Sequence, residues 1–352
     1  MTCLVRRSGQ GDAKRRNLPG WSSPVKPGRL LTMPPAGAIE AREANLAFAP
    51  LIVVKDTIML TLSAARYKAR IAPDAGGTIA ALDWRGRDGR THPLLHAPPG
   101  VVPQTEMPNK FGAWAMLPFA NRAFDSLVDD GHTRFSVPSN NPAGTIHGFG
   151  WQSAWDVEQQ DAGRTVLVHR RMAGPDPYRY LARQEIRLDE TGMTVTLTLT
   201  NEADQALPFG MGLHPWFPCA ADTRLAMTAT GALIFGDQFR ATGTQAFTDG
   251  GPYADNPVFA TGAETAWSFL GWNGTARIET PSTGLAITLS ASENLRYPVV
   301  WAPAGVDFLC AEPQSHAAGA PSEKIVREAS PLARLQPGET LEGWVRIAAE
   351  AI

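Results

Sequence analysis

The chain has 352 residues, of which 43% are hydrophobic and 19% charged, and these values are ordinary for a globular protein with a sizeable core. The formal net charge of −2 excludes a global positive field for nucleic acid or an anionic membrane, and no apolar run is long enough to span a bilayer. Three scattered cysteines are too few for a disulfide framework or a zinc knuckle, and they favour a reducing compartment, so we expect a cytoplasmic protein.

The first 58 residues differ from the rest of the chain. They are basic and rich in Gly, Pro and Ser up to about residue 35, which predicts a poorly ordered extension (1–58) before one domain (59–352). The stretch 51–54 could add a strand. Met59 directly precedes the first convincing strand, so we hypothesise that the natural chain starts there. A targeting peptide is the alternative, and the many prolines disfavour it.

Beyond Met59 the pattern is that of β-strands. Apolar residues alternate with hydroxyl or charged residues at period two in 193–200, 285–290 and 344–347. Short strand-like runs recur between turns rich in Gly, Pro, Asn and Asp, and the one helical candidate is 322–328. This pattern predicts an all-β protein built as a large antiparallel β-sandwich.

Two clusters in the first half of the chain suggest a ligand site. Residues 117–122 read Leu-Pro-Phe-Ala-Asn-Arg, and Arg122 after Asn121 can present a forked donor to sugar hydroxyls or form a surface salt bridge. Residues 145–151 read Thr-Ile-His-Gly-Phe-Gly-Trp. Here His147 lies on a permissive backbone open to a ligand, or serves as a structural turn residue.

A third cluster, 210–217, reads Gly-Met-Gly-Leu-His-Pro-Trp-Phe. Pro215 restricts His214 to an extended backbone. Trp216 can offer an apolar face to the C–H side of a sugar ring, with core packing as the alternative.

The fourth cluster, 306–314, carries a carboxylate at an informative position. Strand parity places Val306, Phe308, Cys310 and Glu312 on one face. A carboxylate that closes an apolar face is costly unless it is paired or takes part in chemistry. A rim glutamate turned toward water is the alternative.

Other chemistries lack their sequence motifs. The histidines show no metal-ligand spacing, such as two His four apart on a helix, and there is no phosphate loop or dinucleotide fingerprint. No nucleophile elbow supports serine catalysis. The sequence therefore predicts neither a metal nor a cofactor.

Taken in order, the clusters resemble the aldose 1-epimerase family over about residues 60–347. The segments that carry the resemblance are Asn121-Arg122, His147-Gly148, His214-Pro215-Trp216-Phe217 and Glu312-Pro313, followed by Leu-Gln-Pro-Gly-Glu at 335–339. The neighbourhoods 116–122 and 147–151 look most like a bacterial branch. The resemblance implies a galactose mutarotase-like supersandwich with an open cleft, and a small-molecule sugar as partner, with no nucleic-acid or membrane partner.

The resemblance also implies roles for six residues. Glu312 is the general base that takes the proton from the anomeric hydroxyl, and His214 is the general acid for the ring oxygen. The sugar is bound and oriented by Arg122, His147, Asn121 and Trp216. The reaction opens and recloses the ring of a free hexose, and it needs no metal, redox step or covalent intermediate.

The sequence departs from the family pattern at two positions. Many relatives carry a sugar-binding Asp shortly before an aromatic-Gly-Trp segment; the best register places Ala266 there, although Glu264 could shift in. Trp216 stands where relatives often have Tyr. These departures bear on the preferred sugar more than on the acid–base pair.

Three alternative functions remain open. A non-catalytic carbohydrate-binding sandwich needs Arg122 and Trp216 but not the pairing of His214 with Glu312. A glycoside hydrolase usually needs two carboxylates about 5 to 10 Å apart, and only one strong candidate is apparent. An epimerase of phosphorylated hexoses needs extra cations at the cleft rim, such as Arg70 or Arg179.

Overall fold

The computed structural model describes residues 59–98, 100, 102, 103, 110–142 and 144–352. The chain divides into two units after Val54, and all described residues belong to the second unit. The predicted extension 1–58 and the possible strand at 51–54 lie outside the described residues.

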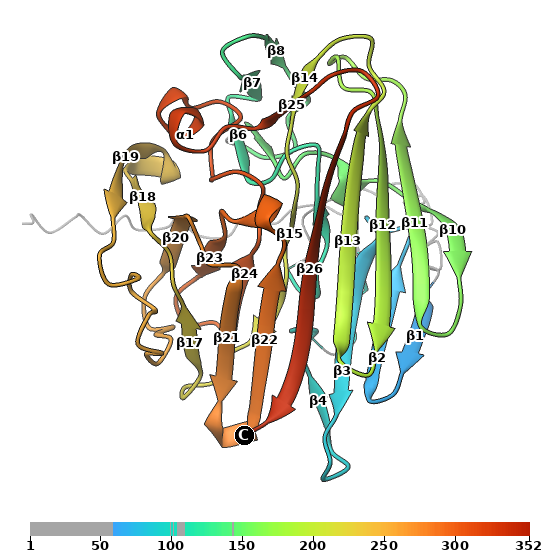
Figure 1. Ribbon diagram of the computed structural model, residues 1–352, viewed down its shortest axis with the longest axis vertical. Coiled ribbons are helices and arrows are strands. Elements are labelled where there is room, and N and C mark those ends of the chain that lie inside the picture. Colours follow the sequence, from blue (N-terminus) through green and yellow to red (C-terminus); the bar gives the residue numbers. More distant parts are fainter. Residues whose placement is uncertain (1–58, 99, 101, 104–109, 143) are drawn as a thin grey trace, which may run out of the picture. The chain divides into compact units, whose positions relative to one another are not determined.

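The largest sheet has eight antiparallel strands and lies nearest the viewer in Figure 1. In spatial order its strands are β10 (Asp156–Gln160), β11 (Arg164–Arg171), β12 (Tyr180–Asp189), β13 (Gly192–Asn201), β26 (Thr340–Ala351), β22 (Leu285–Ala291), β21 (Thr275–Thr280) and β17 (Arg224–Met227). In β13 the apolar side chains are buried and the alternating threonines are half-buried, which is the pattern of a sheet with one core face. This sheet therefore supplies one wall of the core.

Two further sheets lie behind the first (Figure 1). The four-stranded sheet has the order β1 (Leu60–Ala64), β2 (Tyr67–Ala72), β3 (Thr78–Arg85) and β4 (Thr91–Pro93). The six-stranded sheet has the order β16 (Trp216–Pro218), β24 (Phe308–Glu312), β23 (Val299–Ala302), β20 (Thr265–Leu270), β18 (Gly231–Phe235) and β19 (Ala241–Ala246). One continuous apolar core includes residues of all three sheets, such as Leu82, Val195 and Leu309.

Short elements complete the described fold. The two-stranded pairs are β5 (Ala115–Met116) with β15 (Gly212–Leu213), β6 (Arg122–Phe124) with β9 (Gly144–Ile146), β7 (Leu127–Asp129) with β8 (Arg134–Ser136), and β14 (Leu207–Phe209) with β25 (Ala333–Leu335). The α-helix of the described residues is α1 (Lys324–Ala329), beside short 3-10 turns at Gly150–Gln152, Asp237–Phe239, Pro281–Thr283 and Glu293–Leu295.

The prediction of an all-β, antiparallel sandwich is confirmed. The alternating segments at 193–200, 285–290 and 344–347 form β13, β22 and part of β26. The helical candidate at 322–328 corresponds to α1, which begins two residues later. Within the described part of the chain, the helices are too short or too polar to cross a membrane.

Candidate active site

His214 occupies the link between two short strands. It follows β15 and precedes β16, and Pro215 after it favours the extended backbone that both strands need. Its backbone N–H donates to the Trp114 carbonyl oxygen at 3.0 Å, which fixes the link to the β5 side of the site. The imidazole is only 5% exposed.

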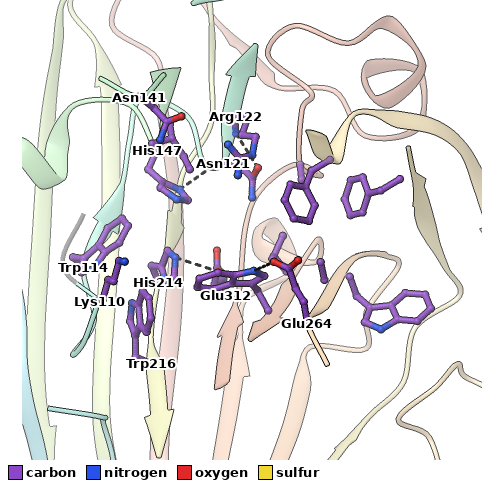
Figure 2. Close-up of a pocket in the computed structure, with 18 residues that line it drawn as sticks. Lys110, Trp114, Asn121, Arg122, Asn141, His147, His214, Trp216, Glu264 and Glu312 are labelled. Carbon is purple, nitrogen blue, oxygen red and sulfur yellow. Dashed lines mark hydrogen bonds and ion pairs between the residues drawn. The ribbon is translucent and has the colours of Figure 1, made fainter. Parts of the chain in front are cut away.

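Glu312 ends β24, the strand that pairs with β16. Trp216 lies opposite Cys310 in that pairing, which brings the end of β24 next to His214. Glu312 Oε1 lies 3.3 Å from His214 Nε2, while Glu312 Oε2 accepts a 3.0 Å hydrogen bond from Gln314 Nε2. Figure 2 shows the two side chains directed toward each other. Strand parity therefore places the carboxylate at the pocket, as the sequence predicts.

Burial sets the protonation of this pair. Glu312 is 2% exposed, and desolvation raises its pKa from 4.5 to about 8, although the Gln314 hydrogen bond acts in the opposite direction. Desolvation likewise lowers the pKa of His214 to about 3. Both shifts disfavour the charged forms, so at neutral pH the pair carries one titratable proton, which these pKa values place on Glu312. A site with one proton on two titratable groups contains one acid and one base.

His147 is held in a single tautomer by a reciprocal backbone contact. His147 and Asn121 both have left-handed backbones, with φ of 59° and 54°. The Asn121 N–H donates to His147 Nδ1 at 3.1 Å, and the His147 N–H donates to the Asn121 carbonyl at 2.8 Å. Because Nδ1 accepts, the ring proton lies on Nε2, and burial keeps the pKa of His147 well below 6.5. His147 is therefore a neutral donor.

The turn at His147 also requires a glycine next to it. Gly148 has φ of 61°, and a Cβ there would lie 2.2 Å from the Leu117 carbonyl oxygen. The His-Gly pair thus has a steric cause in this fold.

Arg122 begins β6 and lines the same pocket. Its backbone pairs with Ile146 of β9, directly before His147. The guanidinium lies 5.4 Å from the ring centroid of Phe239, and among the described residues it has no carboxylate partner within ion-pair distance. Desolvation lowers the pKa of Arg122 from 12.5, yet a guanidinium remains charged. The salt-bridge alternative for Arg122 is therefore not supported, and its donors are available to a ligand.

Trp216 packs against the catalytic candidates and presents little surface to a sugar. The indole is 2% exposed and stacks on His214 at 5.1 Å with an interplanar angle of 10°. Phe308 lies 4.7 Å from the same indole. Although Trp216 lines the pocket, these contacts favour a role in orienting His214.

The pocket that joins these residues has a volume of about 400 Å³, within the range of small-molecule sites. All six predicted site residues line it: Asn121, Arg122, His147, His214, Trp216 and Glu312. Figure 2 shows the histidines and Trp114 along one side, with Glu264 opposite. Residues from both halves of the sequence therefore converge on one cavity.

The positions named for sugar preference and those named for a phosphorylated sugar differ in their relation to the pocket. Glu264 and Ala266 both line the pocket, and the exposed Glu264 carboxylate accepts a 3.3 Å hydrogen bond from the Trp301 indole. Arg70 and Arg179 do not line it, and Arg179 donates instead to backbone carbonyls nearby in sequence. These two arginines, named as examples of cations at the cleft rim, are therefore not among the residues that line this pocket.

His214, Cys310 and Glu312 also form the one group of possible metal ligands found among the described residues. Their donor atoms lie within 4.8 Å of one another. A metal there would bind the Cys310 thiolate and the Glu312 carboxylate, and burial alone raises the pKa of both groups.

Sequence reasoning missed two residues that contact the pair. Trp114 lies 4.4 Å from His214 and 5.1 Å from His147, between ring centroids. Gln314 is fully buried and hydrogen-bonded to Glu312. The only available signal was proximity in sequence: Trp114 precedes the first cluster, and Gln314 ends the fourth.

Comparisons with known proteins identify the family of this chain. The family described as aldose 1-epimerase matches residues 59–348. The uncharacterized protein YphB of Escherichia coli K12 is 30% identical over 292 residues, which is 80% of this chain and 94% of YphB. The structure of a candidate aldose 1-epimerase from Escherichia coli K12 superposes with a TM-score of 0.72 at 27% identity, covering 84% of this chain and 100% of that one.

A second structure supports the fold alone. A galactose mutarotase-like protein from Clostridium acetobutylicum has a TM-score of 0.74 at 21% identity, with coverage of 84% of this chain and 96% of that protein. The fold is thus galactose mutarotase-like, and the match over nearly all described residues shows that this chain belongs to the aldose 1-epimerase family.

Proposed function

We propose that the protein is an aldose 1-epimerase that interconverts the α and β anomers of a free aldose. The observation that carries the proposal is the buried His214–Glu312 pair, in a sugar-sized pocket that Arg122 also lines with no carboxylate partner among the described residues. A binding protein needs donors for hydroxyl groups, but it has no use for a desolvated carboxyl next to a neutral imidazole.

Ring opening follows from moving the titratable proton of the pair. Transfer from Glu312 to His214 across the 3.3 Å contact gives a carboxylate base and an imidazolium acid. Glu312 then takes the proton of the anomeric hydroxyl while His214 protonates the ring oxygen, and the bond between that oxygen and the anomeric carbon breaks. The aldehyde rotates and recloses from its other face as both protons return.

His147 and Arg122 act as hydrogen-bond donors to the oxygen atoms of the sugar at the reacting end. The Nε2–H of His147 is available because Nδ1 is occupied by the Asn121 N–H. The two side chains can orient the sugar and stabilise negative charge near the ring oxygen. His147 stays neutral, so it does not compete with His214 for the proton.

The direct test is the anomerisation of freshly dissolved α-D-glucose and α-D-galactose, followed by polarimetry or proton NMR. We expect the wild-type protein to accelerate it for at least one aldose of a panel that includes pentoses and deoxyhexoses. A folded protein that binds an aldose without accelerating any of them would favour the non-catalytic alternative.

The pH profile should report the titratable proton of the pair. Above pH 8 Glu312 loses the titratable proton of the pair, and His214 then has no proton from Glu312 with which to become an imidazolium acid. We therefore expect kcat/KM to fall as pH rises through about 8. Initial rates corrected for the uncatalysed reaction at each pH would check this. An activity that rises steadily to pH 10 would contradict the single-proton pair.

Gln314 should set where that decline occurs. Its amide donates to Glu312 and favours the carboxylate, which lowers the pKa of that group. We expect Gln314→Leu to raise the pKa and to move the alkaline decline of kcat/KM to higher pH. Gln160→Leu, at an exposed position on β10, is the matched control and should keep the wild-type profile. A profile unchanged by Gln314→Leu would remove Gln314 from this role.

A further inference from the structure

Several of the side chains that line the pocket are apolar, and we call six of them the apolar wall. It consists of Phe235, Phe239, Ala266, Val299, Trp301 and Ala318. Four of these, including Phe239 and Trp301, are only half-buried. Partly exposed apolar surface inside a binding pocket indicates a ligand that is apolar at this end.

The wall offers few hydrogen-bonding groups. The Trp301 indole N–H already donates to Glu264 at 3.3 Å. The backbones of β20 and β23 pair with each other, from Thr265 opposite Ala302 to Ser268 opposite Val299. Besides Glu312, the acidic residue among the described residues that line the pocket is Glu264, and it is exposed. A hydroxyl buried against the wall would therefore lose its water and gain little in exchange.

Strand register places the wall at a fixed distance from the acid–base pair. Val299 lies directly opposite Glu312 on the next strand, and Ala266 lies opposite Trp301 on the strand after that. Neighbouring strands are about 4.8 Å apart, so the Ala266 strand lies roughly 10 Å from that of Glu312. This span suits one aldose whose anomeric hydroxyl reaches Glu312 and whose far end reaches the wall.

Backbone conformation holds an aromatic ring at the other side of the wall. Gln238 and Phe239 are consecutive non-glycine residues with left-handed backbones, at φ of 57° and 61°. Such strained residues concentrate at functional sites. In this conformation the Phe239 ring centroid lies 5.4 Å from the Arg122 guanidinium, so an aromatic ring and a charged hydrogen-bond donor lie next to each other in the pocket.

Resting on the proposed function, we propose that the site prefers deoxyaldoses, whose end remote from the anomeric carbon carries a methyl group in place of a hydroxymethyl group. The methyl group fits the apolar wall, whereas the hydroxymethyl group leaves a hydroxyl without a partner. Apolar pockets discriminate against an added hydroxyl by roughly 10- to 100-fold, and we expect a preference of that size in kcat/KM.

The test uses pairs of aldoses that differ only in the hydroxyl at carbon 6: D-glucose with 6-deoxy-D-glucose, D-galactose with D-fucose, and L-mannose with L-rhamnose. Anomerisation rates give kcat/KM for each member, and tryptophan fluorescence titration gives the binding constants. We expect the deoxy member of the preferred pair to exceed its parent by at least tenfold.

Two variants make the test specific to the wall. Ala266→Asp adds an acceptor to the wall and should shift the ratio toward the parent sugar. Ala246→Asp makes the same change at an exposed position of β19 and should leave the ratio as in the wild type.

The outcomes separate the two proposals. Equal or lower kcat/KM for the deoxy sugars overturns the preference and leaves the epimerase function standing. If no aldose is accelerated, the proposed function fails, and the binding constants alone then decide the preference. Stronger binding of a parent sugar in every pair rejects it.

Discussion

We expect the substitution Glu312→Gln to abolish most of the protein's acceleration of aldose anomerisation. The substitution keeps the size of the side chain and a polar group next to Gln314, but it removes the carboxylate that we propose as the general base. A general base contributes about 10²- to 10⁴-fold, so kcat should fall by that factor while KM changes little. Anomerisation followed by NMR would measure it. Glu190→Gln, in the exposed turn between β12 and β13, is the matched control.

The same variant carries an internal check on its folding. The folded-state pKa of Glu312, about 8, lies above its ordinary value of 4.5, so the folded protein binds the proton more tightly than the unfolded chain. The resulting stability is fully present below about pH 4.5 and is lost as pH rises through 8. Glu312→Gln lacks this loss, so its Tm should rise relative to wild type between pH 5 and 8. If the variant is folded and retains full activity, Glu312 is not the catalytic base.

His214→Asn should have an effect of similar size through the other half of the reaction. Asparagine fits the extended backbone before Pro215, but it cannot give a proton to the ring oxygen. We expect kcat to fall about 10²- to 10⁴-fold, with partial recovery when imidazole is added to the assay.

The matched control for this prediction is His132→Asn, in an exposed turn. It should leave the rate of anomerisation unchanged. If His214→Asn keeps the wild-type kcat, another group donates the proton. His147 would then be the next candidate, because its ring centroid lies 5.2 Å from that of His214.

Much of the fold was predictable because strand periodicity is a local signal. Threonine alternates with apolar residues in 193–200, and β13 buries the apolar set. Parity also placed Glu312 on the same face of β24 as Cys310 and Phe308. In the structure the Cys310 sulfur lies near His214 and Glu312, and the Phe308 ring packs against Trp216. Val306 was predicted on the same strand face, but it lies outside β24, between the turn at Gly305 and the first strand residue, Phe308.

The arrangement of the site was less predictable because strand register is not a local property. The sequence supplied His214 and Glu312 but not the pairing of β16 with β24 that brings them to 3.3 Å. The sequence suggested Trp216 as a sugar platform, whereas its stacking on His214 depends on the same register. Gln314 is an example. The sequence shows an amide two residues after a carboxylate, but it does not show that the two side chains are hydrogen-bonded to each other.

The pairing of β16 with β24 also determines the stage of folding at which His214 and Glu312 come together. Hairpins such as β12 with β13 close short loops, but Trp216 meets Cys310 only after the long intervening segment has been placed. The pair therefore forms in the slow, long-range part of folding. A nascent or cleaved chain that ends before β24 therefore has His214 without the carboxyl group that lies beside it in the folded protein.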